Sequence, residues 1–168
     1  RHTMKSGLGE DVESAGQLIC GAVAAVNALG DIIDPQTGEE IAGLLGDDKK
    51  TLKNSVDFLI ERQKESHFAR THTKARTNTT ISCIVTNARL TKAQATEVAQ
   101  MSADAYAHAI RPTHTTNDGD TVFVMATGEL DAPTDIVGIL ATCALERAIA
   151  DGARQAESAY GFKAAKDL

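Results

Sequence analysis

The predicted order of elements in residues 79–157 constrains the fold most, because strands alternate there with helices. "TTISCIVTNA", residues 79–88, is rich in β-branched residues and predicts a strand, as does "DTVFVMATG", residues 120–128. Between them, residues 90–110 predict a single helix, and residues 134–157 predict a second, alanine-rich helix. This strand, helix, strand, helix order suits sheets with helices packed outside them.

The first of these helices carries its own start and stop signals. Thr91 is placed as the N-cap and Gln94 as its capping-box partner, and Leu90 is placed to pack against Ala95. Pro112 follows the helix and forbids its continuation.

The first half of the chain is less regular. "QLICGAVAAVNALG", residues 17–30, is small, apolar and continuous, which predicts a strand buried on both faces, although a helix has the same signature. Residues 30–43 predict a turn between two short extended pieces. Residues 47–78 start as an amphipathic helix, and residues 66–78 predict an exposed, basic, mobile linker. The apolar stripe of that helix consists of Leu52, Val56, Leu59 and Ile60.

Composition and charge exclude several classes of protein. The chain has 168 residues, 42% of them hydrophobic, which is enough for one globular core without tryptophan. Its formal net charge of -6 argues against a nucleic-acid surface. No apolar run approaches the ~18 residues that a bilayer span needs, so we expect no membrane partner. Because the chain begins with Arg1, a targeting segment ahead of it cannot be assessed.

The cysteines and histidines show no pattern of a disulfide framework or a metal site. Cys20, Cys83 and Cys143 are widely spaced in apolar runs, which favours buried thiols in a reducing, cytoplasmic compartment. The five histidines have no recognised ligand spacing, and we expect them to be solvated. We therefore predict neither a metal nor an organic cofactor.

Asn78 and Thr79 stand between the predicted linker and a predicted strand, where a peptide bond would be strained and accessible. One interpretation is structural, because threonine is common at strand starts. The other is chemical, since a threonine that becomes a new amino terminus carries its own base, the freed α-amine, beside its hydroxyl.

Two further motifs also allow two interpretations. Asp118 and Asp120 precede a strand, where paired carboxylates can orient a catalytic group, or simply form an Asx-type turn. Asn27 is an amide inside a predicted apolar strand, and could be either an oxyanion donor or a satisfied core amide.

Three segments together carry a resemblance to a known family. They are "GAVAAVNALGDIIDPQTGEEIAG", "NTTISCIVTNARLTKAQATEVAQMSADAYAHAIRP" and "NDGDTVFVMATGE". In this order they resemble the L-aminopeptidase/D-Ala-esterase (DmpA-type) family, which includes β-peptidyl aminopeptidases and nylon oligomer hydrolases. The Asn-Thr pair is similar to the nylon oligomer hydrolase branch, whereas several relatives have Gly-Ser there.

The resemblance implies an α+β fold, a four-layer αββα sandwich shared with ornithine acetyltransferase. It also implies self-cleavage between Asn78 and Thr79, with Thr79 as the nucleophile. By the same matching, Asn27 would help bind the oxyanion, and Asp118 and Asp120 would orient the nucleophile and its amine. Aminopeptidase members carry Ser and Glu at those two acidic positions, so the type of substrate stays open.

The same resemblance implies a division of the chain. Residues 1–78 would be the C-terminal part of an α subunit, including the helix and linker of residues 47–78, and residues 79–168 would be the β subunit. Family precursors have a Gly-rich amino-terminal half ahead of the "MKSGLG"-like motif, so we expect that half as a partner that completes the sandwich. A homo-oligomer of α/β heterodimers is expected.

The expected activity is hydrolysis of a peptide or another linear amide bond by Thr79 after self-cleavage. An acyltransferase of the ornithine acetyltransferase kind would use the same threonine but pass the acyl group to an amine. A non-catalytic, truncated subunit that keeps only the fold is the third possibility.

Overall fold

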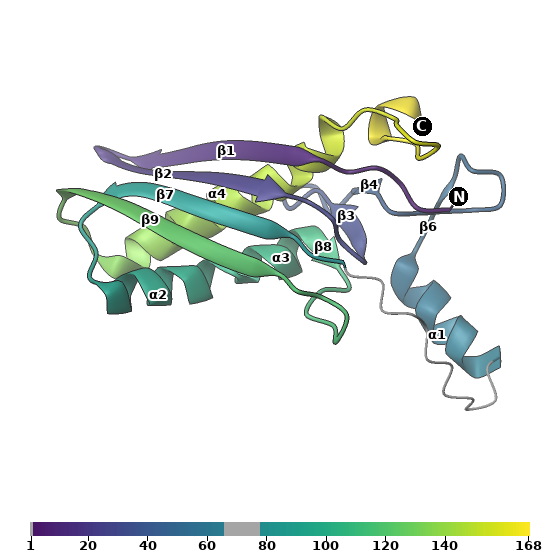
Figure 1. Ribbon diagram of the computed structural model, residues 1–168, viewed down its shortest axis with the longest axis horizontal. Helices are drawn as coiled ribbons and strands as arrows, with labels where there is room; N and C mark the ends of the chain where they lie inside the picture. Colours follow the sequence, from purple (N-terminus) through teal and green to yellow (C-terminus); the bar gives the residue numbers. More distant parts are fainter. Residues whose placement is uncertain (1, 66–77) are drawn as a thin grey trace.

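The computed structural model describes residues 2–65 and 78–168. The largest sheet of this part of the chain has four strands (Figure 1). Across the sheet, the strands are β1 (Leu8–Ala15), β2 (Leu18–Ala25), β7 (Ile81–Ala88) and β9 (Thr121–Leu130). β2 runs antiparallel to both of its neighbours, whereas β7 and β9 are parallel. The strands predicted in residues 79–88 and 120–128 are therefore confirmed, and they lie side by side.

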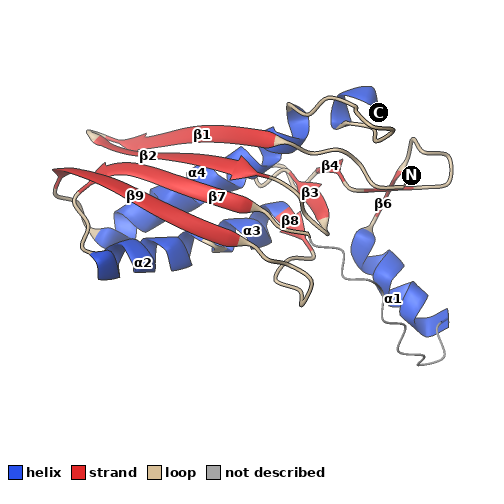
Figure 2. Cartoon of the chain, in the orientation of Figure 1, coloured by secondary structure: helices blue, strands red, loops and turns tan. Residues whose placement is uncertain are grey.

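Three helices cover one face of this sheet: α2 (Lys92–Ser102), α3 (Asp104–Ala109) and α4 (Thr134–Arg154) (Figure 2). Alternate side chains of β2 point into the core, as the period of a strand requires. α4 supplies the opposite wall of the core with small and branched side chains, which allow it to approach the strands closely. The fully buried apolar side chains of α4 include Val137, Ala141, Ala144, Leu145, Ala148 and Ile149.

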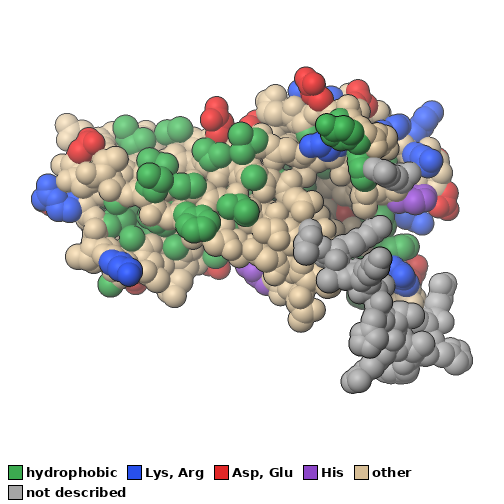
Figure 3. Space-filling view, in the orientation of Figure 1, with side chains coloured by type: hydrophobic (Ala, Val, Ile, Leu, Met, Phe, Trp, Pro, Cys, Tyr) green, Lys and Arg blue, Asp and Glu red, His purple; other side chains and the backbone are tan. Residues whose placement is uncertain are grey.

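The other face of the sheet is open and apolar in the described chain. Phe123 and Met125 of β9 are 57% and 61% exposed, and Figure 3 shows hydrophobic side chains spread over this face. The prediction that residues 17–30 form a strand buried on both faces is therefore wrong, because β2 is buried on the helix side alone. Leu8, Val12, Ile19, Val23, Ile81 and Val85 complete the open face.

The helix predicted for residues 90–110 is interrupted. Its start is confirmed, because Thr91 and Gln94 form the predicted capping box. The hydroxyl of Ser102 donates to the carbonyl oxygens of Val98 and Ala99, at 2.8 and 3.2 Å, and such back-bonding bends helices. The chain turns at Ala103 and continues as the short helix α3.

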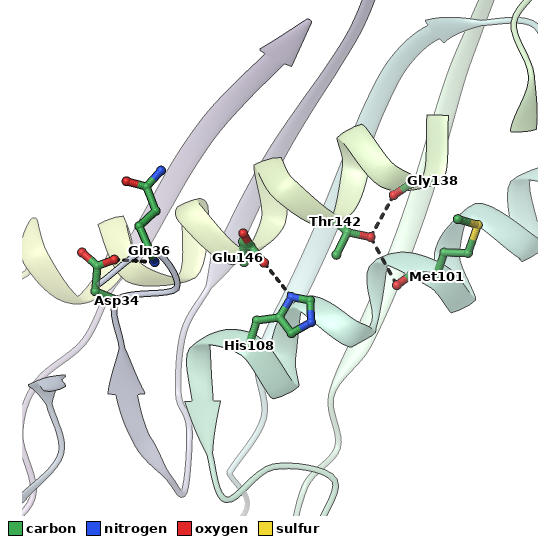
Figure 4. A network of polar contacts seen from close by, with 7 residues as sticks. All are labelled: Asp34, Gln36, Met101, His108, Gly138, Thr142 and Glu146. Atoms are coloured by element: carbon green, nitrogen blue, oxygen red, sulfur yellow. Dashed lines mark hydrogen bonds and ion pairs between the residues drawn. The ribbon is translucent and has the colours of Figure 1, made fainter. Parts of the chain in front are cut away.

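Polar contacts join α4 to α2 and α3 on the outer side of the helix layer (Figure 4). Nδ1 of His108 lies 2.6 Å from Oε2 of Glu146. The hydroxyl of Thr142 donates to the carbonyl oxygens of Gly138, at 2.8 Å, and Met101, at 3.3 Å. The side chain of His108 is 52% exposed, which agrees with the expectation that it is solvated, and it also contacts the carboxylate of Glu146.

Short strands form a second region, which follows the C-terminal end of β2 in the chain. β3 (Asp31–Ile33) pairs with β4 (Glu40–Ala42), which confirms the predicted turn between extended pieces, and with β8 (Ile110–Arg111). β5 (Leu44–Leu45) pairs with β6 (Leu52–Lys53), and the remaining elements are α1 (Ser55–Glu65) and a 3-10 helix at Ala165–Asp167.

The helix predicted after residue 47 begins later than expected. The carboxylate of Asp48 accepts the N–H groups of Lys50 and Thr51, and this turn directs Leu52 into β6 instead of the helix. Asn54 caps the new start, since its side-chain oxygen accepts the N–H of Asp57 at 3.0 Å. Of the predicted linker, residues 66–77 lie outside the described residues.

Candidate functional site

The topology of the main sheet brings the three sequence motifs to one edge. Ala25 of β2 is paired with Ile81 of β7, and Ile81 is paired with Thr121 of β9. The end of β2 and the starts of β7 and β9 therefore lie together. Asn27, the Asn78-Thr79 pair and the segment from Asp118 to Asp120 all stand directly outside these strand ends.

The peptide bond between Asn78 and Thr79 is held from both sides. On one side, the N–H of Thr79 donates to the backbone carbonyl of Asn27 at 2.9 Å. On the other, the N–H of Gly119 donates to the carbonyl oxygen of Asn78 at 3.1 Å. The hydroxyl of Thr79 lies 2.7 Å from the same oxygen, so hydroxyl and carbonyl are already in contact.

Asn27 differs from its prediction. It lies two residues beyond the end of β2 and not inside the strand, and its side chain is exposed, so it is not a buried core amide. Its backbone carbonyl, and not its side chain, makes the contact to Thr79 described above. β2 ends at Ala25, before the apolar run ends, and β3 begins at Asp31.

The carboxylates of Asp118 and Asp120 accept hydrogen bonds from different parts of the chain. Oδ2 of Asp118 accepts the N–H of Thr115 at 2.8 Å, which is a turn contact. Oδ1 of Asp120 instead accepts the N–H of Thr80 at 2.7 Å, so it binds the residue that follows Thr79. Among the described residues, neither carboxylate has a hydrogen bond to the hydroxyl of Thr79.

Burial raises the pKa of Asp120 above its usual value. The hydrogen bond from the N–H of Thr80 opposes this effect, and the negative charge of Asp118 adds to it. One side of the Asp120 carboxyl faces a hollow of about 300 Å³ between α2, α3 and β9, which His114 and Tyr106 also line. A carboxyl group in this setting can exchange a proton at a higher pH than an exposed aspartate can.

Tyr106 of α3 is a site residue that the sequence did not single out. Its side chain is buried, and its hydroxyl bonds the hydroxyl of Ser82 at 3.0 Å and the carbonyl oxygens of Thr121 and Thr80 at 3.1 and 3.3 Å. Burial raises the pKa of Tyr106 to about 12, so the hydroxyl stays protonated and ties the starts of β7 and β9 together. A tyrosine on the apolar side of a helix was the available signal, because a buried tyrosine hydroxyl needs a partner.

Two polar atoms at this edge have no hydrogen-bond partner in the described part of the chain. They are Nδ2 of Asn78 and Oγ1 of Thr80. Buried polar atoms ordinarily have a hydrogen-bond partner, so two such atoms without one at the same sheet edge are unusual.

The described residues contain neither a metal-binding cluster nor a membrane-spanning helix. No three His, Cys, Asp or Glu side chains lie close enough together there to hold a metal ion. None of the helices in residues 2–65 and 78–168 is long and apolar enough to cross a membrane.

Comparison with known sequences gives one family. The model of peptidase family S58 matches residues 2–166. An uncharacterized aminopeptidase of Mycobacterium tuberculosis is 32% identical over 164 residues, which cover 88% of this chain and 47% of that protein. A 6-aminohexanoate-oligomer endohydrolase of Paenarthrobacter ureafaciens is 44% identical over 57 residues, which cover 34% of this chain and 16% of that enzyme. The chain thus spans about half the length of the mycobacterial relative.

Solved structures share the fold. A β-aminopeptidase from a Burkholderia species superposes with a TM-score of 0.59 at 17% identity, over 90% of this chain and 42% of that one. An L-aminopeptidase D-Ala-esterase/amidase from Ochrobactrum anthropi, described as a variant of the Ntn hydrolase fold, gives 0.58 at 15% identity, over 97% and 45%. The likeness confirms the predicted α+β fold, of which the four-stranded sheet and helices α2, α3 and α4 form one sheet layer and one helix layer.

Proposed function

Since this chain belongs to peptidase family S58, we propose that it carries the nucleophile of an amide-bond hydrolase that first cuts its own peptide bond between Asn78 and Thr79. One observation carries the proposal: the hydroxyl of Thr79 lies 2.7 Å from the carbonyl oxygen of that bond. The hydroxyl thus stands beside the carbonyl group whose carbon it must attack, which reduces the ordering that the reaction still needs.

In the first reaction, the oxygen of the Thr79 hydroxyl attacks the carbonyl carbon of Asn78. The C–N bond breaks, the amide nitrogen gains the proton that the hydroxyl loses, and an ester joins the two residues. Water then hydrolyses the ester, which leaves a carboxylate on Asn78 and frees both the hydroxyl and the α-amine of Thr79.

In the second reaction, the freed amine acts as the base for its own hydroxyl. An α-amine has a pKa of about 7.7–8.0, so a useful fraction is unprotonated near neutral pH. The carbonyl of Asn27, which holds the N–H of Thr79 before cleavage, remains placed to hold this amine. The hydroxyl attacks a substrate amide, the leaving amine departs with a proton, and water hydrolyses the acyl-enzyme.

We assign the charged carboxylate of Asp120, anchored on the N–H of Thr80, to orienting Thr79 and its freed amine, and Asp118 to the loop that carries Asp120. We assign the exposed side chain of Asn27 to the oxyanion of the substrate reaction. The substitution Asn27→Ala should therefore lower turnover about 10²- to 10³-fold. It should leave self-cleavage intact, because the backbone carbonyl is retained. Equal loss of both reactions would contradict this division, and mass spectrometry with a turnover assay separates them.

The open face of the sheet suggests the partner. Its apolar side chains, among them Phe123 and Met125, need a covering layer, and the relatives are about twice as long as this chain. An amino-terminal half that packs there, in an oligomer of α/β heterodimers, accounts for both facts.

The three free cysteines, Cys20, Cys83 and Cys143, suit the cytoplasm.

The test is a mass spectrum of the full-length protein, with sequencing of any new amino terminus. We expect a cut between residues 78 and 79 in the wild type and in Thr79→Ser, and none in Thr79→Ala. The matched control is Thr80→Val, which removes the neighbouring hydroxyl and should still be cut. A cut at another bond, or cutting of Thr79→Ala, would show that Thr79 is not the nucleophile.

The substrate is defined by a second assay. Cleaved protein is incubated with α-peptide amides, β-peptide amides and 6-aminohexanoate oligomers, with and without added amino acids as acyl acceptors. Release of free acid indicates a hydrolase, whereas transfer to the added amine indicates an acyltransferase. An intact bond in the full-length protein, together with no turnover, would indicate a non-catalytic subunit.

A further inference from the structure

The carbonyl oxygen of Asn78 accepts two hydrogen bonds, one from the hydroxyl of Thr79 at 2.7 Å and one from the N–H of Gly119 at 3.1 Å. The second bond is a rung of the parallel ladder that continues β7 and β9, since Asn78 forms a bridge with Asp118. The next rung is similar, because the N–H of Thr121 donates to the carbonyl of Thr80 at 3.1 Å. On the oxygen of the second rung the neighbouring hydroxyl is that of Tyr106, at 3.3 Å, and not that of a residue next to the cleaved bond.

We propose that the N–H of Gly119 is the oxyanion donor for self-cleavage, an inference that rests on the proposed cut between Asn78 and Thr79. When the oxygen of Thr79 bonds to the carbonyl carbon, the π electrons of the C=O bond move onto the Asn78 oxygen. That oxygen already accepts the N–H of Gly119, so the new charge forms against a donor in place. When the C–N bond breaks, the electrons return and the C=O bond reforms in the ester.

The surroundings of Gly119 fix the direction of its N–H. The carbonyl of Gly119 accepts the hydroxyl of Thr121 at 3.1 Å. On either side, the carboxylates of Asp118 and Asp120 are anchored to the N–H groups of Thr115 and Thr80. A donor held in this way needs no reorganisation when charge develops, which is how preorganised donors accelerate acyl transfer.

The close approach of Thr79 explains why a glycine stands between the two aspartates. A Cβ atom on residue 119 would lie 2.8 Å from Oγ1 of Thr79 and 3.7 Å from its Cγ2. Any side chain would therefore press on the nucleophile and move it from the carbonyl. An ordinary ladder position makes no such demand, because side chains there point away from the neighbouring strand's backbone.

The test removes the donor without adding an atom. In cell-free translation of the full-length protein, residue 119 is replaced by glycolic acid, so that an ester oxygen takes the place of the N–H. The matched control replaces Thr121 by its α-hydroxy acid and removes the next rung of the same ladder, the bond to Thr80. Cleavage is followed by mass spectrometry, and thermal unfolding checks that both variants fold.

We expect the ester at residue 119 to slow self-cleavage about 10²- to 10³-fold, as loss of one oxyanion donor does. The ester at residue 121 should slow it by less than about tenfold, with a similar loss of thermal stability. Equal effects of the two esters, or wild-type cleavage with the ester at 119, would overturn the inference while the proposed function stands. If the wild type itself is not cut between residues 78 and 79, both this inference and the proposed function are wrong.

Discussion

Two pairs of carboxylates, each buried or half-buried, differ in their neighbours. Asp118 and Asp120 stand at the start of β9, where each accepts a backbone N–H and where the hydroxyl of Thr79 lies on a peptide carbonyl. Asp31 and Glu40 stand on the paired strands β3 and β4, at the start of α1. Both pairs include a carboxyl group whose pKa is raised, Asp120 in the first and Glu40 in the second.

The second pair has a structural explanation. Asp31 is 2% exposed and accepts the N–H groups of Ser55, at 2.7 Å, and Leu44, at 3.2 Å, so it joins β3 to α1 and β5. Oε1 of Glu40 is buried without a hydrogen-bond partner among the described residues. Burial, and then the negative charge of Asp31, raise the pKa of Glu40 to about 7.

A raised pKa therefore does not by itself mark a catalytic group, because structural clusters shift pKa values too. An adjacent glycine does not distinguish the pairs either. A Cβ atom on Gly43 would lie 2.2 Å from Oδ1 of Asp31, and one on Gly119 would lie 2.8 Å from Oγ1 of Thr79. Only the pair at β9 adjoins a hydroxyl in contact with a peptide bond.

The largest effect should come from Asp120→Asn. Asp120→Asn removes the charge that orients Thr79 and its amine and the ability to exchange a proton, so it should lower turnover, and slow self-cleavage, by about 10²- to 10⁴-fold. The midpoint of thermal unfolding should change little, because the amide oxygen can still accept the N–H of Thr80. A rate within tenfold of the wild type would mean that this pair is as structural as Asp31 and Glu40.

A smaller effect, on stability alone, is expected for Asp31→Asn. An amide at residue 31 cannot accept all of the bonds that the carboxylate accepts, and an unsatisfied buried group costs about 1–3 kcal/mol of unfolding free energy. Urea unfolding measures this loss, and the cleavage rate of the folded variant should stay at the wild-type value. Slowed self-cleavage in the folded variant would contradict the purely structural role of Asp31 and Glu40.

Glu40→Gln should change the pH dependence of stability. Because the pKa of Glu40 is higher in the folded state, the folded chain binds more protons than the unfolded chain between about pH 4.5 and 7. The free energy of unfolding therefore falls as pH rises through this window. Discounted for partial exposure, the gain from Glu40→Gln at pH 8 is on the order of 1–2 kcal/mol.

Urea unfolding at pH 5 and pH 8 measures the effect of Glu40→Gln. The substitution should reduce the difference in unfolding free energy between pH 5 and pH 8, by raising stability at pH 8. Self-cleavage should continue. The single substitution Asp31→Asn serves as a check, since removing the charge of Asp31 should lower the pKa of Glu40 and reduce the fall in stability between pH 5 and pH 8. A variant less stable at pH 8 than the wild type would contradict the burial of an unpaired carboxylate here.

The smallest effect is expected for Thr80→Val. Thr80 is fully buried and its Oγ1 has no partner in the described residues, so a methyl group in its place loses no hydrogen bond. Stability should be unchanged or higher by up to about 1 kcal/mol, and cleavage should stay within a few-fold of the wild type. A large loss of cleavage would indicate that the Thr80 hydroxyl has a partner in the cleaving protein.

The order of strands and helices in residues 79–157 was readable because its signals are local. β-branched runs, the capping box of Thr91 and the turn of residues 30–43 depend on near neighbours in the chain. The motifs around Asn27, Thr79 and Asp118 to Asp120 were also readable as residue types. Their meeting at one edge was implied by resemblance, and the register of β2, β7 and β9 supplies its physical basis.

The sequence alone predicted the alternation of strands and helices in residues 79–157, the capped start of α2 and the residue types at the candidate site. Only the tertiary structure decided that β2 is covered on one face, that the backbone of Asn27 contacts Thr79, and that the N–H of Gly119 reaches the carbonyl of Asn78. The reason is that local propensity acts over a few residues. These contacts join segments about 40 to 50 residues apart, and strand register sets their distances.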